Sequence, residues 1–166
     1  GVPLKSHQDI LRLEEIVTLA RVAANKGIDR IRLTGGEPLV RKNVVTLVKQ
    51  LAAIATIKEL TLTTNGTLLG GLAKPLKAAG LSRVNISLDT LNKERYLYIT
   101  RKGNLNSVWE GIKAALNAGL TPVKLNVVIT RGFNEDEILD FARLADEHPL
   151  HIRFIELMPI GTALTT

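Results

Sequence analysis

The residues that could do chemistry begin with one short stretch, RIRLTGGEP, which starts at Arg30. Its first half alternates polar and apolar side chains, which predicts a strand with Arg30 and Arg32 on one face. Gly35 and Gly36 follow, and paired glycines let a backbone turn sharply and expose its polar groups to a ligand. Glu37 adds a carboxylate. The stretch indicates either a site for a zwitterion beside an anion, or a plain strand-to-helix turn with two surface arginines.

Polar faces of the same kind recur in four later segments that alternate polar and apolar residues. Their polar members are Thr61 and Thr63; Asn85, Ser87 and Asp89; Lys124 and Asn126; and Arg153. With Arg30 and Arg32, this places four cations on the polar faces, and Asp89 and Glu37 can offset part of their charge. Cations that share one cavity repel each other unless an anion is supplied. Because guanidinium groups bind phosphate oxygens in bidentate fashion, the pattern predicts a triphosphate-like ligand.

The elements that must position these residues alternate along the chain. Helical periodicity predicts helices at about 13–26, 44–55, 69–79, 92–99, 105–118 and 135–147, and the strands fall at about 29–34, 59–64, 84–89, 123–130 and 151–156. Asn134 and Glu137 have the spacing of a capping box. Pro75 is expected to kink its helix or to mark a late start. Helices alternating with strands predict a parallel sheet with crossover helices.

Two architectures contain such a sheet: an open doubly wound fold and part of a (β/α) barrel. In a doubly wound sheet helices cover both faces, so the strands are apolar throughout. Here one face of each strand is polar, which favours a wide or incomplete barrel around a wet cavity. A closed eight-stranded barrel does not fit, because its centre is filled with branched apolar side chains. We therefore expect an α/β fold, a partial TIM-like barrel, in one domain over residues 1–166.

Composition excludes several classes of function. The 166 residues include no cysteine, which excludes disulfides and iron–sulfur ligation by this chain. The three histidines lack metal-ligand spacing, so we predict no metal site. A net charge of +6 with 4% aromatic residues and no basic run favours a small anion over a nucleic-acid polymer. No apolar run approaches the ~18 residues of a membrane span, so we expect no membrane partner.

The segment from Arg30 to Lys42 resembles the signature of radical S-adenosylmethionine enzymes. More narrowly, it resembles the GTP 3',8-cyclase family, which starts molybdenum cofactor biosynthesis. The family pattern recurs, in order, in residues 63–66, 85–90, 122–126 and 153–159. The resemblance covers nearly the whole chain. It implies a radical S-adenosylmethionine type (β/α)6 barrel with five parallel strands present and the first strand missing.

The resemblance implies a set of cofactor-binding residues. Gly35, Gly36 and Glu37 match the turn that holds the methionine moiety of S-adenosylmethionine. Ser87 matches a hydrogen-bonding contact to the same cofactor, and Met158 matches a contact near its adenosine. No residue of the chain is implied as a general acid or base.

The resemblance also implies a substrate-binding set for GTP. Arg32, Thr63 and Lys124 match GTP-binding positions, and Arg30 and Arg153 match further basic positions of the same cavity. A possible homodimer and a downstream cofactor-synthesis protein are the implied protein partners. The implied location is the cytoplasm, or the mitochondrion in a eukaryotic source.

The chain departs from the family pattern at both ends. The family has a CxxxCxxC loop for a [4Fe–4S] cluster after its first strand, and a C-terminal region with a second cluster; neither occurs here. We therefore expect the chain to be part of a longer enzyme that holds the [4Fe–4S] clusters, and to be inactive alone.

Two other functions remain open at this point. The first is a barrel lyase that uses Lys124 as a Schiff-base nucleophile on a phosphorylated sugar. The second is a non-catalytic module that binds nucleotides or a protein partner through the same basic cavity.

Overall fold

The computed structural model describes residues 10–158 of the chain. Five strands form one sheet: β1 (Arg30–Leu33), β2 (Glu59–Thr64), β3 (Arg83–Ser87), β4 (Val123–Ile129) and β5 (Leu150–Glu156). Their order in the sheet is their order in the sequence, and every neighbouring pair is parallel. Within the described range β1 and β5 are open edges. The predicted α/β fold, five parallel strands of a partial barrel, is confirmed.

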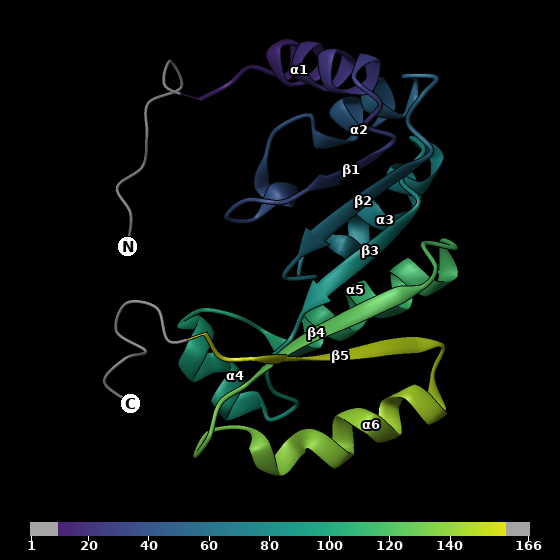
Figure 1. Ribbon diagram of the computed structural model, residues 1–166. Helices are drawn as coiled ribbons and strands as arrows, with labels where there is room; N and C mark the ends of the chain where they lie inside the picture. The colour runs from purple at the N-terminus through teal and green to yellow at the C-terminus, as the bar shows by residue number, and fades with distance from the viewer. Residues whose placement is uncertain (1–9, 159–166) are drawn as a thin grey trace.

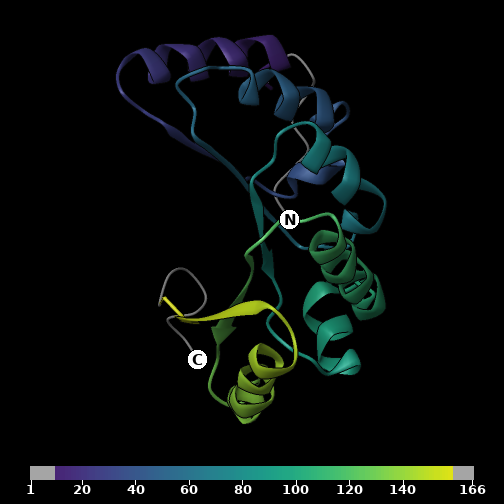
Figure 2. The same ribbon diagram turned by 90° about the vertical axis from the view of Figure 1, so that its right-hand side faces the viewer.

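The helices lie along the outer side of this curved sheet (Figures 1 and 2). They are α1 (Leu13–Asn25), α2 (Val44–Ala52), α3 (Leu69–Ala78), α4 (Lys93–Thr100), α5 (Leu105–Asn117) and α6 (Ile138–Glu147), with 3-10 turns η2 (Pro38–Val40) and η3 (Glu135–Glu137). In Figure 2 no described helix covers the opposite side of the sheet. That side is the one the polar residues face. None of the helices between residues 10 and 158 is long and apolar enough to cross a bilayer.

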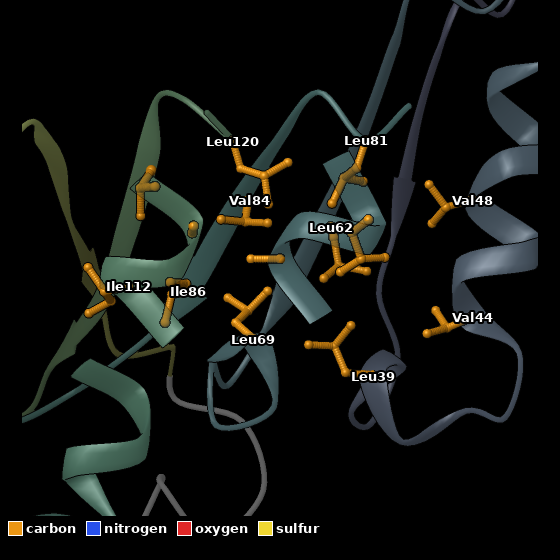
Figure 3. Close-up of a cluster of buried hydrophobic side chains, with 14 of the residues drawn as sticks. Leu39, Val44, Val48, Leu62, Leu69, Leu81, Val84, Ile86, Ile112 and Leu120 are labelled. Atoms are coloured by element: carbon orange, nitrogen blue, oxygen red, sulfur yellow. The ribbon is translucent and has the colours of Figure 1, made fainter. Parts of the chain in front are cut away.

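The hydrophobic core lies between the sheet and the helices (Figure 3). Leu62 of β2 and Ile86 of β3 are fully buried there, against Leu69 of α3 and Ile112 of α5. Burying one such side chain stabilises the fold by about 1.5–3 kcal/mol relative to exposure. One face of each strand is therefore committed to the core, which fixes which residues face the other way.

Helix α5 lies very close to the turn that follows β2. A Cβ atom added at Gly111 would lie 2.1 Å from the carbonyl oxygen of Gly66, so only glycine fits at this point of α5. Gly66 has φ of 81°, a conformation that favours glycine. The contact fixes the end of β2, where Thr63 is located.

The structure excludes one of the two alternatives for Pro75 and contradicts the predicted capping box. Pro75 lies inside α3 and does not mark a late start, because Leu69, Ala73 and Leu76 hold the helix on the core. Asn134 and Glu137 do not form a capping box: Asn134 makes no side-chain hydrogen bond to the helix, and a 3-10 turn precedes α6. Both side chains are used instead in contacts with the segment after β3, described below.

Candidate ligand-binding face

Alternation along the strands and their register bring the predicted polar residues onto one side of the sheet. We call this side the polar face, made of Arg30, Arg32, Glu59, Thr61, Thr63, Arg83, Asn85, Ser87, Lys124, Asn126, His151 and Arg153. Lys124 pairs with Asn85, and Arg153 pairs with Asn126. All five residues of the predicted substrate set therefore lie on this face.

An acid and an arginine that are not among the predicted site residues, Glu59 and Arg83, lie among these cations. Arg83 Nε donates to Glu59 Oε1 at 2.8 Å, and Arg83 Nη1 donates to Asn85 Oδ1 at 3.2 Å. Arg30 Nε lies 4.0 Å from Glu59 Oε2. The hydrogen bond from Arg83 lowers the pKa of the Glu59 carboxyl below 4.5, and the charges of Arg83, Arg30 and Lys124 add to this effect. The strand alternation could have revealed both residues, because each lies two positions before a selected one.

The acids expected to offset the cations are used elsewhere. Glu37 Oε1 accepts hydrogen bonds from Leu39 N at 3.0 Å and Thr64 Oγ1 at 2.8 Å, and its Oε2 accepts from Asn65 N at 2.7 Å. The carboxylate thus joins the turn after β1 to the end of β2. Asp89 Oδ1 accepts from Val128 N at 2.8 Å. Glu59 contacts two of the cations, Arg30 and Arg83, and Asp29, which precedes β1, also lies 4.0 Å from Arg30.

The turn after β1 borders open space. Gly35 has φ of 142°, which other residues rarely adopt. A Cβ atom added at Gly35 or at Gly36 would have no atom within 4 Å. A cavity of about 880 Å³ lies here, lined by Thr34 and the Gly35–Gly36–Glu37 turn together with residues 10 to 14, Pro38 and residues 40 to 43. Ser87, Lys124 and Arg153 are not among the residues that line it.

Ser87 lies at the end of β3, beside Asn126 of β4. Ser87 is exposed, while the Oδ1 atom of Asn126 is buried and has no hydrogen-bond partner within the described part of the chain. An unpartnered buried acceptor is costly, so a ligand donor would stabilise it. Met158 follows β5 and is 67% exposed. Pro159, the last residue of the matched pattern, lies outside the described residues.

Glu137, in the loop after β4, connects this loop to the segment after β3. Its Oε1 accepts from Thr90 Oγ1 at 2.7 Å, and its Oε2 accepts from Leu91 N at 2.6 Å. Arg95 Nη1 also donates to Oε1, at 2.8 Å. Glu137 is 7% exposed, and Thr90 is fully buried. Its partners lie more than 40 positions away, which is why the local sequence pattern gave no sign of them.

Asn134 completes this connection. Its Nδ2 atom donates to the carbonyl oxygens of Asp89 at 2.6 Å and Val128 at 2.8 Å, and its Oδ1 accepts from Thr130 N at 2.7 Å. Burial raises the pKa of the Asp89 carboxyl, and the hydrogen bond from Val128 opposes this in part. The ends of β3 and β4 are thereby held together beside Ser87.

Metal-binding chemistry finds no support in the described residues. Between residues 10 and 158 no group of three or more His, Cys, Asp or Glu could hold a metal ion. The complete sequence has no cysteine.

A family model described as the radical SAM superfamily matches residues 3–145 of the chain. Over 98% of its length the chain is 80% identical to the GTP 3',8-cyclase of Moorella thermoacetica, of which it covers 50%. It is 60% identical to the GTP 3',8-cyclase of Pelotomaculum thermopropionicum, again over 98% of this chain and 50% of that protein. The chain therefore spans about half the length of these curated relatives.

Solved structures share the fold at low sequence identity. The structure of native anSMEcpe with bound AdoMet matches with a TM-score of 0.73 and 18% identity, over 95% of this chain and 46% of that one. The [FeFe]-hydrogenase maturase HydG matches with a TM-score of 0.71 and 17% identity, over 95% of this chain and 38% of that one. At such identities the likeness concerns the fold alone.

Proposed function

The chain belongs to the radical SAM superfamily, and on this premise we propose that it forms the central part of a GTP 3',8-cyclase. The observation that carries the proposal is the convergence of Arg32, Lys124 and Arg153 on one uncovered side of a partial barrel. The 80% identity to a named GTP 3',8-cyclase supports it. In the proposed reaction, GTP is cyclised to a precursor of molybdopterin, the first step of molybdenum cofactor biosynthesis.

The residues present fit S-adenosylmethionine. The Gly35–Gly36 turn is bordered by open space, and Asn126 offers a buried acceptor beside the hydroxyl of Ser87. When bound, this cofactor would supply the radical that abstracts a hydrogen atom from the ribose of GTP. We propose that the backbone of the turn and Ser87 hold it, with Met158 close to its adenosine. The carboxylate of Glu37 would act by bracing the turn, because both of its oxygens already accept hydrogen bonds.

The residues present do not fit a [4Fe–4S] cluster, because the chain has no cysteine. We infer that the cluster ligands belong to other parts of the whole protein, and that this chain alone does not catalyse the reaction. The chain's own contribution is to bind and orient the two ligands.

The polar face suits the triphosphate of GTP. Arg32 and Arg153 can each bind two phosphate oxygens, and Lys124 adds a compact charge. Thr63 Oγ1 accepts a weak hydrogen bond from Asn85 Nδ2 at 3.4 Å, which leaves its hydroxyl hydrogen free to donate to the ligand. Arg30 extends the positive charge toward the start of β1.

Calorimetric titration of the whole protein with GTP, without reductant, tests this assignment. Lys124→Ala should weaken GTP binding about tenfold, which corresponds to about 1.4 kcal/mol. Lys58→Ala is the matched control, because Lys58 precedes β2 and bonds to Asp29 at 3.0 Å outside the polar face. Its GTP affinity should stay within about twofold of the wild type. Equal affinities for the Lys124 variant and the wild type would contradict the proposal.

The other functions considered from sequence have no observation in their favour. Borohydride trapping of a substrate carbonyl on Lys124 would establish the lyase. Binding of GTP by the whole protein without any turnover would favour the non-catalytic module. The homodimer, the downstream protein partner and the cytoplasmic location remain predictions.

A further inference from the structure

Glu59 begins β2 and lies between two cations of the polar face, Arg30 on β1 and Arg83 on β3. Its two carboxylate oxygens face different cations: Oε1 accepts from Arg83 at 2.8 Å, and Oε2 lies 4.0 Å from Arg30. Lys124 is close enough to lower the pKa of Glu59, although its strand is two places away in the sheet. One carboxylate therefore contacts cations on both neighbouring strands, Arg30 of β1 and Arg83 of β3.

The pair of Glu59 and Arg83 is partly shielded from solvent. The side chains are 29% and 17% exposed, respectively, so water screens their charges less than it screens those of surface pairs. Arg83 also donates to Asn85, which is 1% exposed and donates in turn to Thr63. Glu59 is thus connected to Thr63, one of the residues proposed to bind GTP.

We propose that Glu59 is a built-in counter-ion that holds Arg83 and Arg30 in position in the free protein and competes with ligand phosphates for the cations of the polar face. The inference rests on the proposed function, since it takes the polar face to bind the triphosphate. It makes Glu59 and Arg83 positioning residues that set the affinity for anions. If Glu59 only supported the structure, removing its charge would weaken ligand binding or leave it unchanged. If its carboxylate competes with phosphates, removing the charge should strengthen binding.

The test is calorimetric titration of the whole protein with GTP and, separately, with inorganic triphosphate. Glu59→Gln keeps the size of the side chain and removes the competing charge, so both ligands should bind about threefold to tenfold more tightly. Asp29→Asn is the matched control. Asp29 lies 4.0 Å from Arg30 and bonds to Lys58, but it precedes β1 and lies outside the polar face. Its removal should change either affinity less than about twofold.

Arg83→Gln and the double variant with Glu59→Gln make the test independent of how well one variant folds. Arg83→Gln leaves the carboxylate without its main partner, so GTP should bind more weakly than to the wild type. The double variant removes both charges and should bind with an affinity between those of the two single variants. Arg83→Gln binding as tightly as the wild type, or Glu59→Gln binding no more tightly than Asp29→Asn, would overturn the proposal.

The failures of the two proposals are distinguishable. Unchanged GTP affinity in Lys124→Ala would show that the polar face is not the phosphate site, and both proposals would fail. Weakened binding in Lys124→Ala, together with no gain in Glu59→Gln, would keep the phosphate site and reject only the counter-ion.

Discussion

Thr64 donates its hydroxyl hydrogen to Oε1 of Glu37 across 2.8 Å. The same relationship recurs between Thr90 and Glu137 at 2.7 Å. In both cases the second carboxylate oxygen accepts from the amide of the residue after the threonine. Both threonine hydroxyls also accept, at 3.1 Å, from the amide two positions further on. Each glutamate thus ties its own loop to the loop after a neighbouring strand, at the edge of the sheet where ligands of parallel α/β folds bind.

Glu37→Gln should destabilise the chain by about 1–3 kcal/mol, because the new amide group cannot accept the hydrogen bond that one carboxylate oxygen accepts now. Urea unfolding measures the loss. Glu110→Gln is the control, since Glu110 is exposed on α5 and its change should stay within about 0.5 kcal/mol. Equal stability of the two variants would show that the carboxylate does not brace the turn.

Two adjacent acids that contact the same arginine should differ sharply in their effect on stability. Arg95 pairs with Asp136 at 2.7 Å and with Glu137 at 2.8 Å. Glu137→Gln should cost about 1–3 kcal/mol, because a buried acceptor of the Leu91 amide is lost. Asp136→Asn should cost clearly less, because that carboxylate is exposed and water screens its pair with Arg95. Chemical denaturation of both variants decides, and similar losses would argue against the buried connection.

Variants at the two glycines of the turn distinguish the effect of backbone strain from the effect of blocking a ligand. Gly35→Ala forces alanine into φ of 142° and should cost about 1–3 kcal/mol of stability. Gly36 has no positive φ, and its added methyl group would enter open space, so Gly36→Ala should fold with nearly unchanged stability. The same methyl group should weaken binding of S-adenosylmethionine to the whole protein about tenfold or more. If calorimetry showed that Gly36→Ala binds S-adenosylmethionine as tightly as the wild type, the turn would not be part of the cofactor site.

Asp89→Asn should change stability in a pH-dependent way. Burial raises the pKa of Asp89 in the folded state above its ordinary 3.8, so the folded wild type loses stability as the pH rises through that raised pKa. Asparagine keeps an oxygen that can accept from Val128 N and carries no charge. The variant should therefore be more stable than the wild type at pH 7, and the difference should shrink as the pH falls through the raised pKa toward 3.8. Unfolding curves between pH 3 and pH 7 that show no such trend would contradict this account.

Sequence alternation was sufficient for the strands and for the face that most of the polar residues occupy, but β3 ends at Ser87, before Asp89. Glu59–Thr64 alternates along its length, and the structure begins and ends β2 at those residues. The apolar side chains of the strands are buried in the core, so the polar side chains that alternate with them must lie on the opposite face of the sheet. The binding roles predicted for individual residues came from the resemblance to a family, because alternation shows only which face a residue occupies.

Contacts between residues that are far apart in the chain could not be predicted from the sequence. Asn134 and Glu137 have the local spacing of a capping box, yet their partners at Asp89 and Thr90 lie more than 40 positions away. Glu59 and Arg83 begin β2 and β3, and neither belongs to the motifs that carry the family resemblance. Alternation places them on the polar face, and the register of the sheet sets them beside Arg30 and Thr61.

The most direct test of the central claim is a crystal structure of the whole protein with GTP bound and no reductant present. The account predicts the triphosphate on the polar face, within hydrogen-bonding distance of Arg32 and Lys124, with Arg153 nearby. Phosphates bound on the helix side of the sheet, or away from all three side chains, would contradict it.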